Sequence, residues 1–311
     1  MRKKTVKKVC VAASLTAEQK KRLEAACPDY EFVYGKDEDA QIVIGYLPIA
    51  ELKQFKRLEW LQTMSAGVER YIAKGALNEG VTLTNASGVH TREVAEHLLA
   101  VLLMMVKKLH TYRDDQKLHV WRDEGKVKEI TKLKVTILGL GDIGSYLARQ
   151  LKALGIHVIG VKRKAIEKPD FVDELYTGSE LEKAISDVDA VISLLPGNRE
   201  NVGLFTVDTF RKMRSDCIFI NAGRGNLCDE ETLETVLDEK IIAGIAADVY
   251  PKEPLPAGSP LWDHENLVVT PHAAGGYHLD SATEALIDLC IENLNRYREG
   301  KPLKNLISER E

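Results

Sequence analysis

The chain has 311 residues, of which 44% are hydrophobic and 29% are charged, and its formal net charge is −4 at pH 7. This length suits two domains better than one core, and the small negative charge gives no reason to expect nucleic acid or an anionic membrane surface as a partner. The sequence shows neither a run of about 20 apolar residues that could span a membrane nor the features of a signal peptide. We therefore expect a globular, cytoplasmic protein.

The first third of the chain alternates short apolar runs with helical segments. A helix is expected to open at Thr16, with Glu18 and Gln19 in its first turn. The basic segment MRKKTVKK at residues 1–8 is expected to be a solvated tail that leads into the first strand. Strands are expected at residues 6–13, 30–34, 41–44, 60–63 and 81–84, and this alternation predicts a small flavodoxin-like unit.

A long helical run follows, from Thr91 to about His119, with no proline or glycine to interrupt it. It is long enough to cross from one domain to another. Its apolar positions recur at helical spacing, at Val94, Ala95, Leu98, Leu99, Leu102 and Leu103.

The remaining chain alternates strands and helices again. A last helix, from about Ser281 to Arg298, has no sheet of its own and is expected to return to the first domain. We therefore predict an α/β fold with a Rossmann dinucleotide-binding domain at 91–276 and a smaller flavodoxin-like substrate domain formed by 1–90 and 277–311. The six strands of the dinucleotide-binding sheet are expected near 133–138, 156–161, 189–194, 217–221, 241–246 and 267–270.

The cysteines are odd in number and form no CxxC pair or Cys/His cluster, so neither a disulfide framework nor a metal site is expected. Cys10 and Cys217 lie in apolar strand-like runs and are predicted core residues. Cys228 has no paired histidine in view, which argues against a nucleophilic role. The five are Cys10, Cys27, Cys217, Cys228 and Cys290.

The segment ILGLGDIG, residues 137–144, is the strongest functional signal. It lies between a strand-like run and an amphipathic helix, which is the context in which Gly-x-Gly-x-x-Gly binds a pyrophosphate. Gly139 permits the tight turn, Gly141 lets the backbone approach the phosphates, and Gly144 lets the helix pack closely on the strand. The predicted cofactor contacts here are Gly139, Gly141, Asp142, Ile143 and Gly144.

Three charged residues follow three successive strands of this predicted domain. Arg224 stands in INAGRG, Glu253 in DVYPKEP and His272 in TPHAAGG. Each alone has a plain structural explanation, but open α/β sheets bind ligands at the carboxyl ends of their strands, where all three would meet. Arginine binds a carboxylate through two parallel hydrogen bonds, histidine transfers protons near neutral pH, and a carboxylate can fix its tautomer and favour its charged form.

At these residues the sequence resembles the D-isomer-specific 2-hydroxyacid dehydrogenase family. The similar motifs are GxGxxG at 139–144, NAGRG at 221–225, DVxxxEP at 248–254 and PLW at 260–262 followed by TPHxAG at 270–275, and SAGVE at 65–69 and VAEHLL at 94–99 extend the likeness over almost the whole chain. The resemblance implies that His272 is the acid/base, Glu253 its partner and Arg224 the anchor for the substrate.

The same resemblance implies that Ala66 and Gly67 lie in a backbone loop that grips the substrate carboxylate, and that Asp248 faces the nicotinamide carboxamide. PGNREN at 196–201 departs from the family, in which threonines often lie near the pyrophosphate, although Asn201 can still donate a hydrogen bond. Further cofactor contacts are expected at Leu195, Pro196, Asn201, Ala222, Gly223 and Asp248.

The second departure concerns the end of the second strand of the dinucleotide fold, where NAD-specific proteins place an acid for the ribose hydroxyls. This chain has Lys162, Arg163 and Lys164 there, and its first carboxylate is Glu167. Cations suit a 2′-phosphate, so NADP(H) is the expected cofactor, with NAD(H) possible if the basic turn is only solvated surface.

These observations favour an NADPH-preferring reductase that converts a small 2-oxo acid into the D-2-hydroxy acid, as glyoxylate/hydroxypyruvate reductases do. A phosphoglycerate dehydrogenase-like enzyme that uses NAD is the alternative within the family. An NAD(H)-sensing corepressor-like binding protein is the alternative of another class, and a turnover assay separates it from the enzymes. The resemblance also implies a homodimer formed through the dinucleotide-binding domain.

Overall fold

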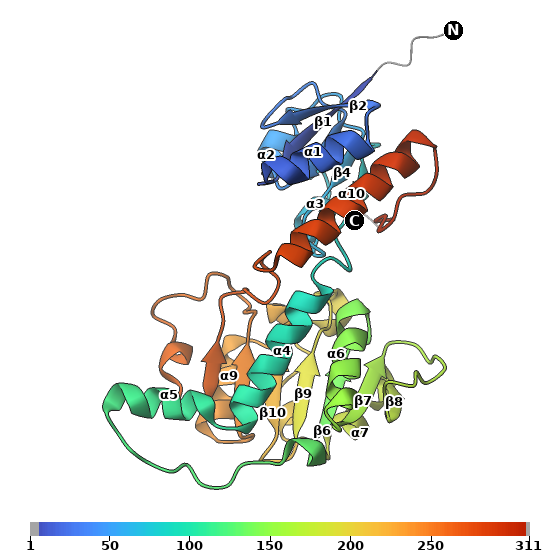
Figure 1. Cartoon of the computed structure of the whole chain (residues 1–311). Coiled ribbons are helices and arrows are strands. Elements are labelled where there is room, and N and C mark those ends of the chain that lie inside the picture. The colour runs from blue at the N-terminus through green and yellow to red at the C-terminus, as the bar shows by residue number, and fades with distance from the viewer. Residues whose placement is uncertain (1–5, 309–311) are drawn as a thin grey trace. The chain divides into compact units, whose positions relative to one another are not determined.

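The computed structural model describes residues 6–308, which fold into two compact units (Figure 1). Unit 1 comprises the described residues up to His90 together with those from Tyr277 onward, and unit 2 runs from Thr91 to Gly276. The α/β class predicted from the sequence is confirmed, since every strand pair in both sheets is parallel. No helix among the described residues is long and apolar enough to cross a membrane.

Unit 1 is built on a five-stranded sheet in the order β2-β1-β3-β4-β5, the strand order of flavodoxin-like folds. Its strands are β1 (Lys7–Ala12), β2 (Tyr30–Tyr34), β3 (Ile42–Gly45), β4 (Trp60–Gln62) and β5 (Thr82–Thr84). Its helices are α1 (Ala17–Ala26), α2 (Ile49–Leu52), α3 (Glu69–Ile72) and α10 (Asp280–Arg298).

Two local signals explain helices of this unit. Thr16 and Gln19 cap α1 reciprocally, because the hydroxyl of Thr16 accepts the N–H of Gln19 and the Gln19 amide oxygen accepts the N–H of Thr16. Helix α10 carries an apolar stripe that is buried with the strands of unit 1. The stripe consists of Ala282, Leu286, Cys290 and Leu294.

Unit 2 contains a seven-stranded sheet in the order β12-β11-β10-β9-β6-β7-β8, one strand more than predicted. The unpredicted strand is β8, a four-residue edge strand whose side chains are all only partly buried. The strands are β6 (Lys134–Leu138), β7 (His157–Lys162), β8 (Glu174–Thr177), β9 (Ala190–Ser193), β10 (Ile218–Asn221), β11 (Gly244–Ala247) and β12 (Leu267–Val269).

The prediction of one continuous helix from Thr91 to His119 is wrong. The structure has α4 (Thr91–Val106) and α5 (Leu109–Leu118), separated by Lys107 and Lys108. Lys108 adopts a left-handed conformation with φ of 56°, which ends the first helix and redirects the chain. The buried face of α4 also ends at Val106, so the polar α5 has no continuous apolar stripe to follow.

Helices cover both faces of the sheet in unit 2. One core cluster contains side chains from α4 and α6 (Asp142–Ala153), and the other contains side chains from α7 (Leu181–Ile185), α8 (Val207–Phe210) and α9 (Glu230–Asp238). Neighbouring residues of β6 alternate between them, with Ile137 in the first cluster and Leu138 in the second. Burial on both faces leaves the carboxyl ends of the strands as the place for ligand-binding loops.

Candidate active site

The glycine turn between β6 and α6 has the geometry of a phosphate-binding loop. Gly139 has φ of +102°, and a Cβ atom on Gly144 would lie 2.1 Å from the carbonyl oxygen of Gly139, so neither position accepts a side chain without rearrangement. A Cβ atom on Gly141 would meet nothing within 4 Å, and no side chain caps α6. The backbone N–H groups at the start of α6 are therefore available to an anion.

A cavity of about 480 Å³ lies against this turn. Lys162 is the last residue of β7, and both it and Arg163 line the cavity, whereas Lys164 is not among the lining residues. Within residues 6–308 no carboxylate forms an ion pair with either of these two cations. The predicted cofactor residues at this cavity are Gly139, Gly141, Lys162, Arg163, Leu195, Pro196 and Asn201.

The loop after β9 closes one wall of the cavity. Asn201 was expected to donate a hydrogen bond near the pyrophosphate. In the structure its Nδ2 donates to the carbonyl oxygen of Pro196 at 2.8 Å, and this bond holds the loop in place. Asp142, Ile143 and Gly144 form the first turn of α6. The open backbone, the free helix terminus and the two cations together fit the phosphates of a dinucleotide.

The loop after β10 holds Arg224 in a space that only glycine neighbours permit. A Cβ atom on Gly223 would lie 2.5 Å from the Leu195 carbonyl oxygen, and one on Gly225 would lie 2.0 Å from the carbonyl carbon of Tyr250. Ala222 precedes them, with its N–H bonded to the oxygen of Ser193 at 3.1 Å. The Arg224 guanidinium donates from Nη1 to the oxygen of Gly223 at 2.8 Å, which orients its charged end.

His272 and Glu253 form a hydrogen-bonded pair at the neighbouring strand ends. Nδ1 of His272 lies 2.7 Å from Oε2 of Glu253, and the second oxygen of Glu253 accepts the N–H of Tyr250 at 3.0 Å. A carboxylate only accepts, so Nδ1 is the donor. The His272 side chain is about half exposed, and its φ of 52° lies in the left-handed region, which is uncommon for a residue with a side chain.

Asp248 is buried behind this loop and holds it in place. Oδ1 accepts the Thr270 hydroxyl at 2.6 Å and the N–H of Ala273 at 2.9 Å, and Oδ2 accepts the N–H of Ala274 at 3.1 Å. The carbonyl oxygen of Asp248 also accepts the N–H of His272 at 2.8 Å. Asp248 therefore determines where the backbone of His272 lies.

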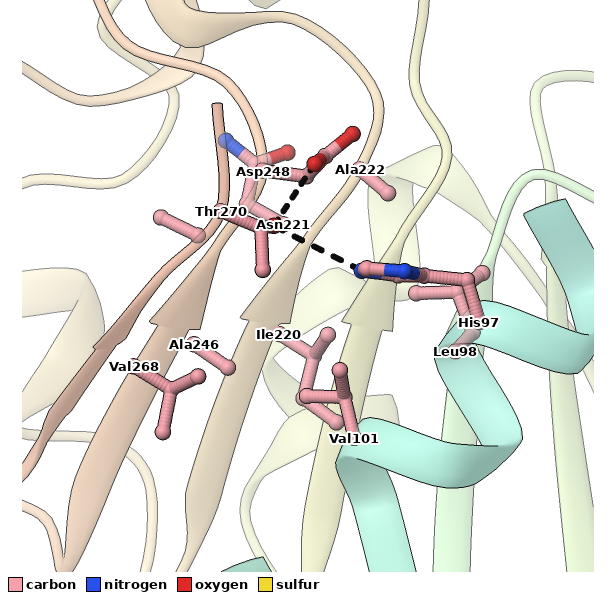
Figure 2. A pocket seen from close by; sticks show the side chains of 11 residues that line it. His97, Leu98, Val101, Ile220, Asn221, Ala222, Ala246, Asp248, Val268 and Thr270 are labelled. Carbon is pink, nitrogen blue, oxygen red and sulfur yellow. Dashed lines mark hydrogen bonds between the residues drawn. The ribbon is translucent and has the colours of Figure 1, made fainter. Parts of the chain in front are cut away.

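The same network contains His97 of α4, a residue that sequence reasoning assigned no role. Figure 2 shows the His97 ring directed toward Thr270, whose hydroxyl oxygen lies 3.5 Å from Nε2. Because the Thr270 proton is donated to Asp248, its oxygen can only accept from His97. A cavity of about 10 Å³, close to the size of one water, lies among these residues and Asn221. The partners are 173 residues apart, so only the fold reveals them.

The two predicted carboxylate-binding residues, Ala66 and Gly67, belong to unit 1. They lie in the loop after β4, where Asn85 donates from Nδ2 to the Ala66 oxygen at 2.7 Å and the Ser65 hydroxyl donates to the Gly67 oxygen at 2.7 Å. The other predicted residues of the site all belong to unit 2 and follow the carboxyl ends of its strands, where His272 and Glu253 are in contact.

The cysteines take no part in this site. All five are buried and free, and burial raises the pKa of Cys228 to about 12, so its thiolate is scarce at neutral pH. The predicted core positions of Cys10 and Cys217 are confirmed by their complete burial. Among residues 6–308 no cluster of His, Cys, Asp or Glu is arranged to hold a metal ion.

Comparison with known proteins places these features in a family context. The model of the D-isomer specific 2-hydroxyacid dehydrogenase NAD binding domain matches residues 99–274. The chain is 28% identical over 290 residues to a glyoxylate reductase of Korarchaeum cryptofilum, covering 88% of this chain and 84% of that protein.

Two solved structures are similar over almost their whole length. A D-isomer specific 2-hydroxyacid dehydrogenase family protein from Aeromonas salmonicida has a TM-score of 0.87 at 28% identity, covering 98% of this chain and 99% of that one. The NADPH-dependent glyoxylate/hydroxypyruvate reductase of Sinorhizobium meliloti, solved with NADP and sulfate, has a TM-score of 0.82 at 26% identity, covering 97% and 98%.

Proposed function

Because the chain belongs to the D-isomer specific 2-hydroxyacid dehydrogenase family, we propose that it reduces a small 2-oxo acid to the D-2-hydroxy acid, with NADPH as its preferred hydride donor. The observation that carries the proposal is the 2.7 Å hydrogen bond between His272 and Glu253 at the strand ends beside Arg224. Nδ1 of His272 is committed to Glu253, so Nε2 is the ring atom that can exchange a proton with a substrate.

The chemistry follows from the charges of these three residues. A reduced nicotinamide supplies a hydride when it is bound. His272 in its imidazolium form donates the Nε2 proton to the oxygen that becomes negative during reduction, and Glu253 stabilises that imidazolium. Arg224 stabilises the same negative oxygen and binds the carboxylate of the acid. Ala66 and Gly67 are proposed to complete carboxylate binding through their backbone N–H groups.

The preference for NADPH is supported by Lys162 and Arg163 at the cavity beside the glycine turn. An acid at this position would accept the ribose hydroxyls and repel a phosphate, whereas two unpaired cations attract it. The solved Sinorhizobium meliloti reductase, which is similar to this chain, is NADPH-dependent. The same cations weigh against the phosphoglycerate dehydrogenase-like alternative that uses NAD.

We further propose that the protein works as a homodimer in the cytoplasm. Large apolar side chains are exposed on α5 and the segment after it, and the indole of Trp121 is fully exposed. Monomers rarely expose such a patch, so a second copy is a fitting cover for it. Light scattering should give a mass of about twice the 34.7 kDa chain. A mass that stays at one chain at every concentration would exclude the dimer.

The proposed location in the cytoplasm is supported by the five free thiols, which suit a reducing compartment.

The test of the proposed reaction is a substrate screen with the full chain. Glyoxylate, hydroxypyruvate, phosphohydroxypyruvate and bulkier 2-oxo acids are each offered with NADPH and with NADH. Chiral chromatography determines the configuration of every product except glycolate, which has no stereocentre. We expect cofactor oxidation with glyoxylate or hydroxypyruvate, faster with NADPH. Turnover of phosphohydroxypyruvate with NADH would favour the phosphoglycerate dehydrogenase-like alternative, and cofactor binding without any turnover would favour the corepressor-like one.

A further inference from the structure

The carbonyl group of Met64 is held by two aromatic side chains of unit 1. The Tyr277 hydroxyl donates a hydrogen bond to the Met64 oxygen, and Nε2 of His90 lies 3.4 Å from the same atom. The rings of His90 and Tyr277 contact each other edge to face, with centroids 4.4 Å apart. Tyr277 and Met64 are 213 residues apart in sequence, so this contact is built by the fold.

Met64 directly precedes the loop that is proposed to bind the substrate carboxylate, and the following carbonyls are held as well. The Ser65 oxygen accepts the Thr63 hydroxyl at 2.9 Å and the N–H of Ala86 at 3.0 Å. The oxygens of Ala66 and Gly67 accept the side chains of Asn85 and Ser65, as described above. Four consecutive peptide oxygens are therefore fixed by the protein.

Fixing these oxygens also fixes the direction of the N–H groups. In a trans peptide the C=O and the next residue's N–H point to opposite sides, so the bound oxygen of Met64 aims the N–H of Ser65 away from Tyr277. Within residues 6–308, the N–H groups of Ser65, Ala66 and Gly67 donate to no protein acceptor. Successive backbone N–H groups without a protein acceptor can bind an anion.

The backbone of Tyr277 indicates that its position is imposed by its surroundings. Its φ is 60°, in the left-handed region that bulky side chains rarely adopt. Such a conformation persists only where other contacts determine it, and it is found preferentially at functional sites. The Tyr277 ring is packed against the core of unit 1, which holds the hydroxyl at the Met64 oxygen.

We propose that Tyr277 is a positioning residue for the carboxylate-binding loop, with the His90 ring supporting it. By holding the Met64 oxygen, Tyr277 keeps the Met64–Ser65 peptide from rotating and keeps the Ser65 N–H directed toward the substrate carboxylate. This inference rests on the proposed function, in which the loop that contains Ala66 and Gly67 receives that carboxylate.

The test compares Tyr277→Phe with Tyr30→Phe in the full chain. Tyr30 is a matched control because its hydroxyl donates to a main-chain oxygen, that of Leu294 at 2.8 Å, within the same unit. Steady-state kinetics use glyoxylate or hydroxypyruvate, and binding of oxamate, a non-reacting 2-oxo acid analogue, is measured calorimetrically with the cofactor present. Hydrogen exchange of the Thr63 and Ala86 amides, which donate to the oxygens of Thr84 and Ser65, reports on the loop without requiring turnover.

Tyr277→Phe should raise KM for the acid and Kd for oxamate about tenfold, the factor expected for losing one hydrogen bond, and should leave KM for the cofactor unchanged. Exchange of the Thr63 and Ala86 amides should become faster by a similar factor. Tyr30→Phe should change none of these values. Unchanged exchange and KM in Tyr277→Phe, or equal changes in both variants, would overturn the positioning role. Faster exchange in a protein that neither turns over 2-oxo acids nor binds oxamate would overturn the proposed function alone.

Discussion

His272 and Glu253 are joined by a hydrogen bond of 2.7 Å, and Glu253 is itself held by the backbone N–H of Tyr250. Both ends of the carboxylate are thus fixed, so the imidazole ring has one orientation to offer. An exposed ion pair without such support would not fix the ring in this way. Substitution of His272 therefore tests the role of this orientation in catalysis.

His272→Ala should lower kcat by about 10²–10⁴-fold, the usual scale for losing a general acid, with little change in NADPH binding. His157→Ala is the matched control, since His157 also bonds to a glutamate, Glu174, at 2.8 Å, but stands at the amino end of β7. Initial-rate kinetics and fluorescence titration with NADPH measure the two effects. Full turnover in His272→Ala would remove this residue from the mechanism.

Arg224→Lys keeps the positive charge but loses the planar guanidinium group that can make two parallel hydrogen bonds to a carboxylate. We expect KM for the oxo acid to rise and kcat to fall, together by about 10- to 100-fold in kcat/KM, because one charged hydrogen bond is lost in the bound and reacting states. Arg211→Lys, at an exposed ion pair of the same unit, is the control. The anchor role fails if KM for the acid is the same in both variants.

The preference for NADPH over NADH in kcat/KM should be about 10- to 100-fold or more, because one or two charged hydrogen bonds to the 2′-phosphate contribute about 1.5–3 kcal/mol each. Lys162→Asp combined with Arg163→Ala should erase or invert it and flatten the salt dependence of NADPH binding. Lys164→Ala, outside the cavity, should leave it intact. An unmodified protein that already prefers NADH would refute this prediction.

Thr270→Val removes the hydroxyl that Asp248 accepts and His97 supports. We expect a loss of about 1–3 kcal/mol in unfolding free energy, since a buried carboxylate loses a donor, and a fall in kcat of up to about 10²-fold from the displaced His272 loop. Thr270→Ser keeps the hydroxyl and should restore most of both. Urea unfolding and initial rates provide the measurements, and equal kcat in Val and Ser variants would contradict the coupling to catalysis.

The sequence was sufficient for features that depend on local pattern. The glycine turn and the burial of Cys10 and Cys217 follow from residue type and period, and the α/β class follows from the alternation of strands and helices. The edge strand Glu174–Thr177 was not predicted, because four half-buried residues give almost no hydrophobic periodicity. The break between α4 and α5 was not predicted, because Lys108 adopts a left-handed conformation that is usually signalled in a sequence by glycine.

Contacts between distant segments could not be predicted. Nothing near His97 in the sequence signals Thr270, and nothing near Met64 signals Tyr277, because each pair is created by strand order and loop closure. The roles of Arg224, Glu253 and His272 remain predictions, although the structure does bring His272 and Glu253 into contact.

The complete burial of the native thiols makes the protein convenient for single-molecule fluorescence. Burial raises the pKa of Cys217 and Cys290 to about 12, as it does for Cys228, so maleimide dyes have few native targets at neutral pH. One new cysteine on each unit, through Lys21→Cys and Lys183→Cys at exposed positions, would accept a donor and an acceptor dye with all five natural cysteines in place. Energy transfer between the dyes would then measure the distance between the two labelled positions before and after cofactor and acid are added.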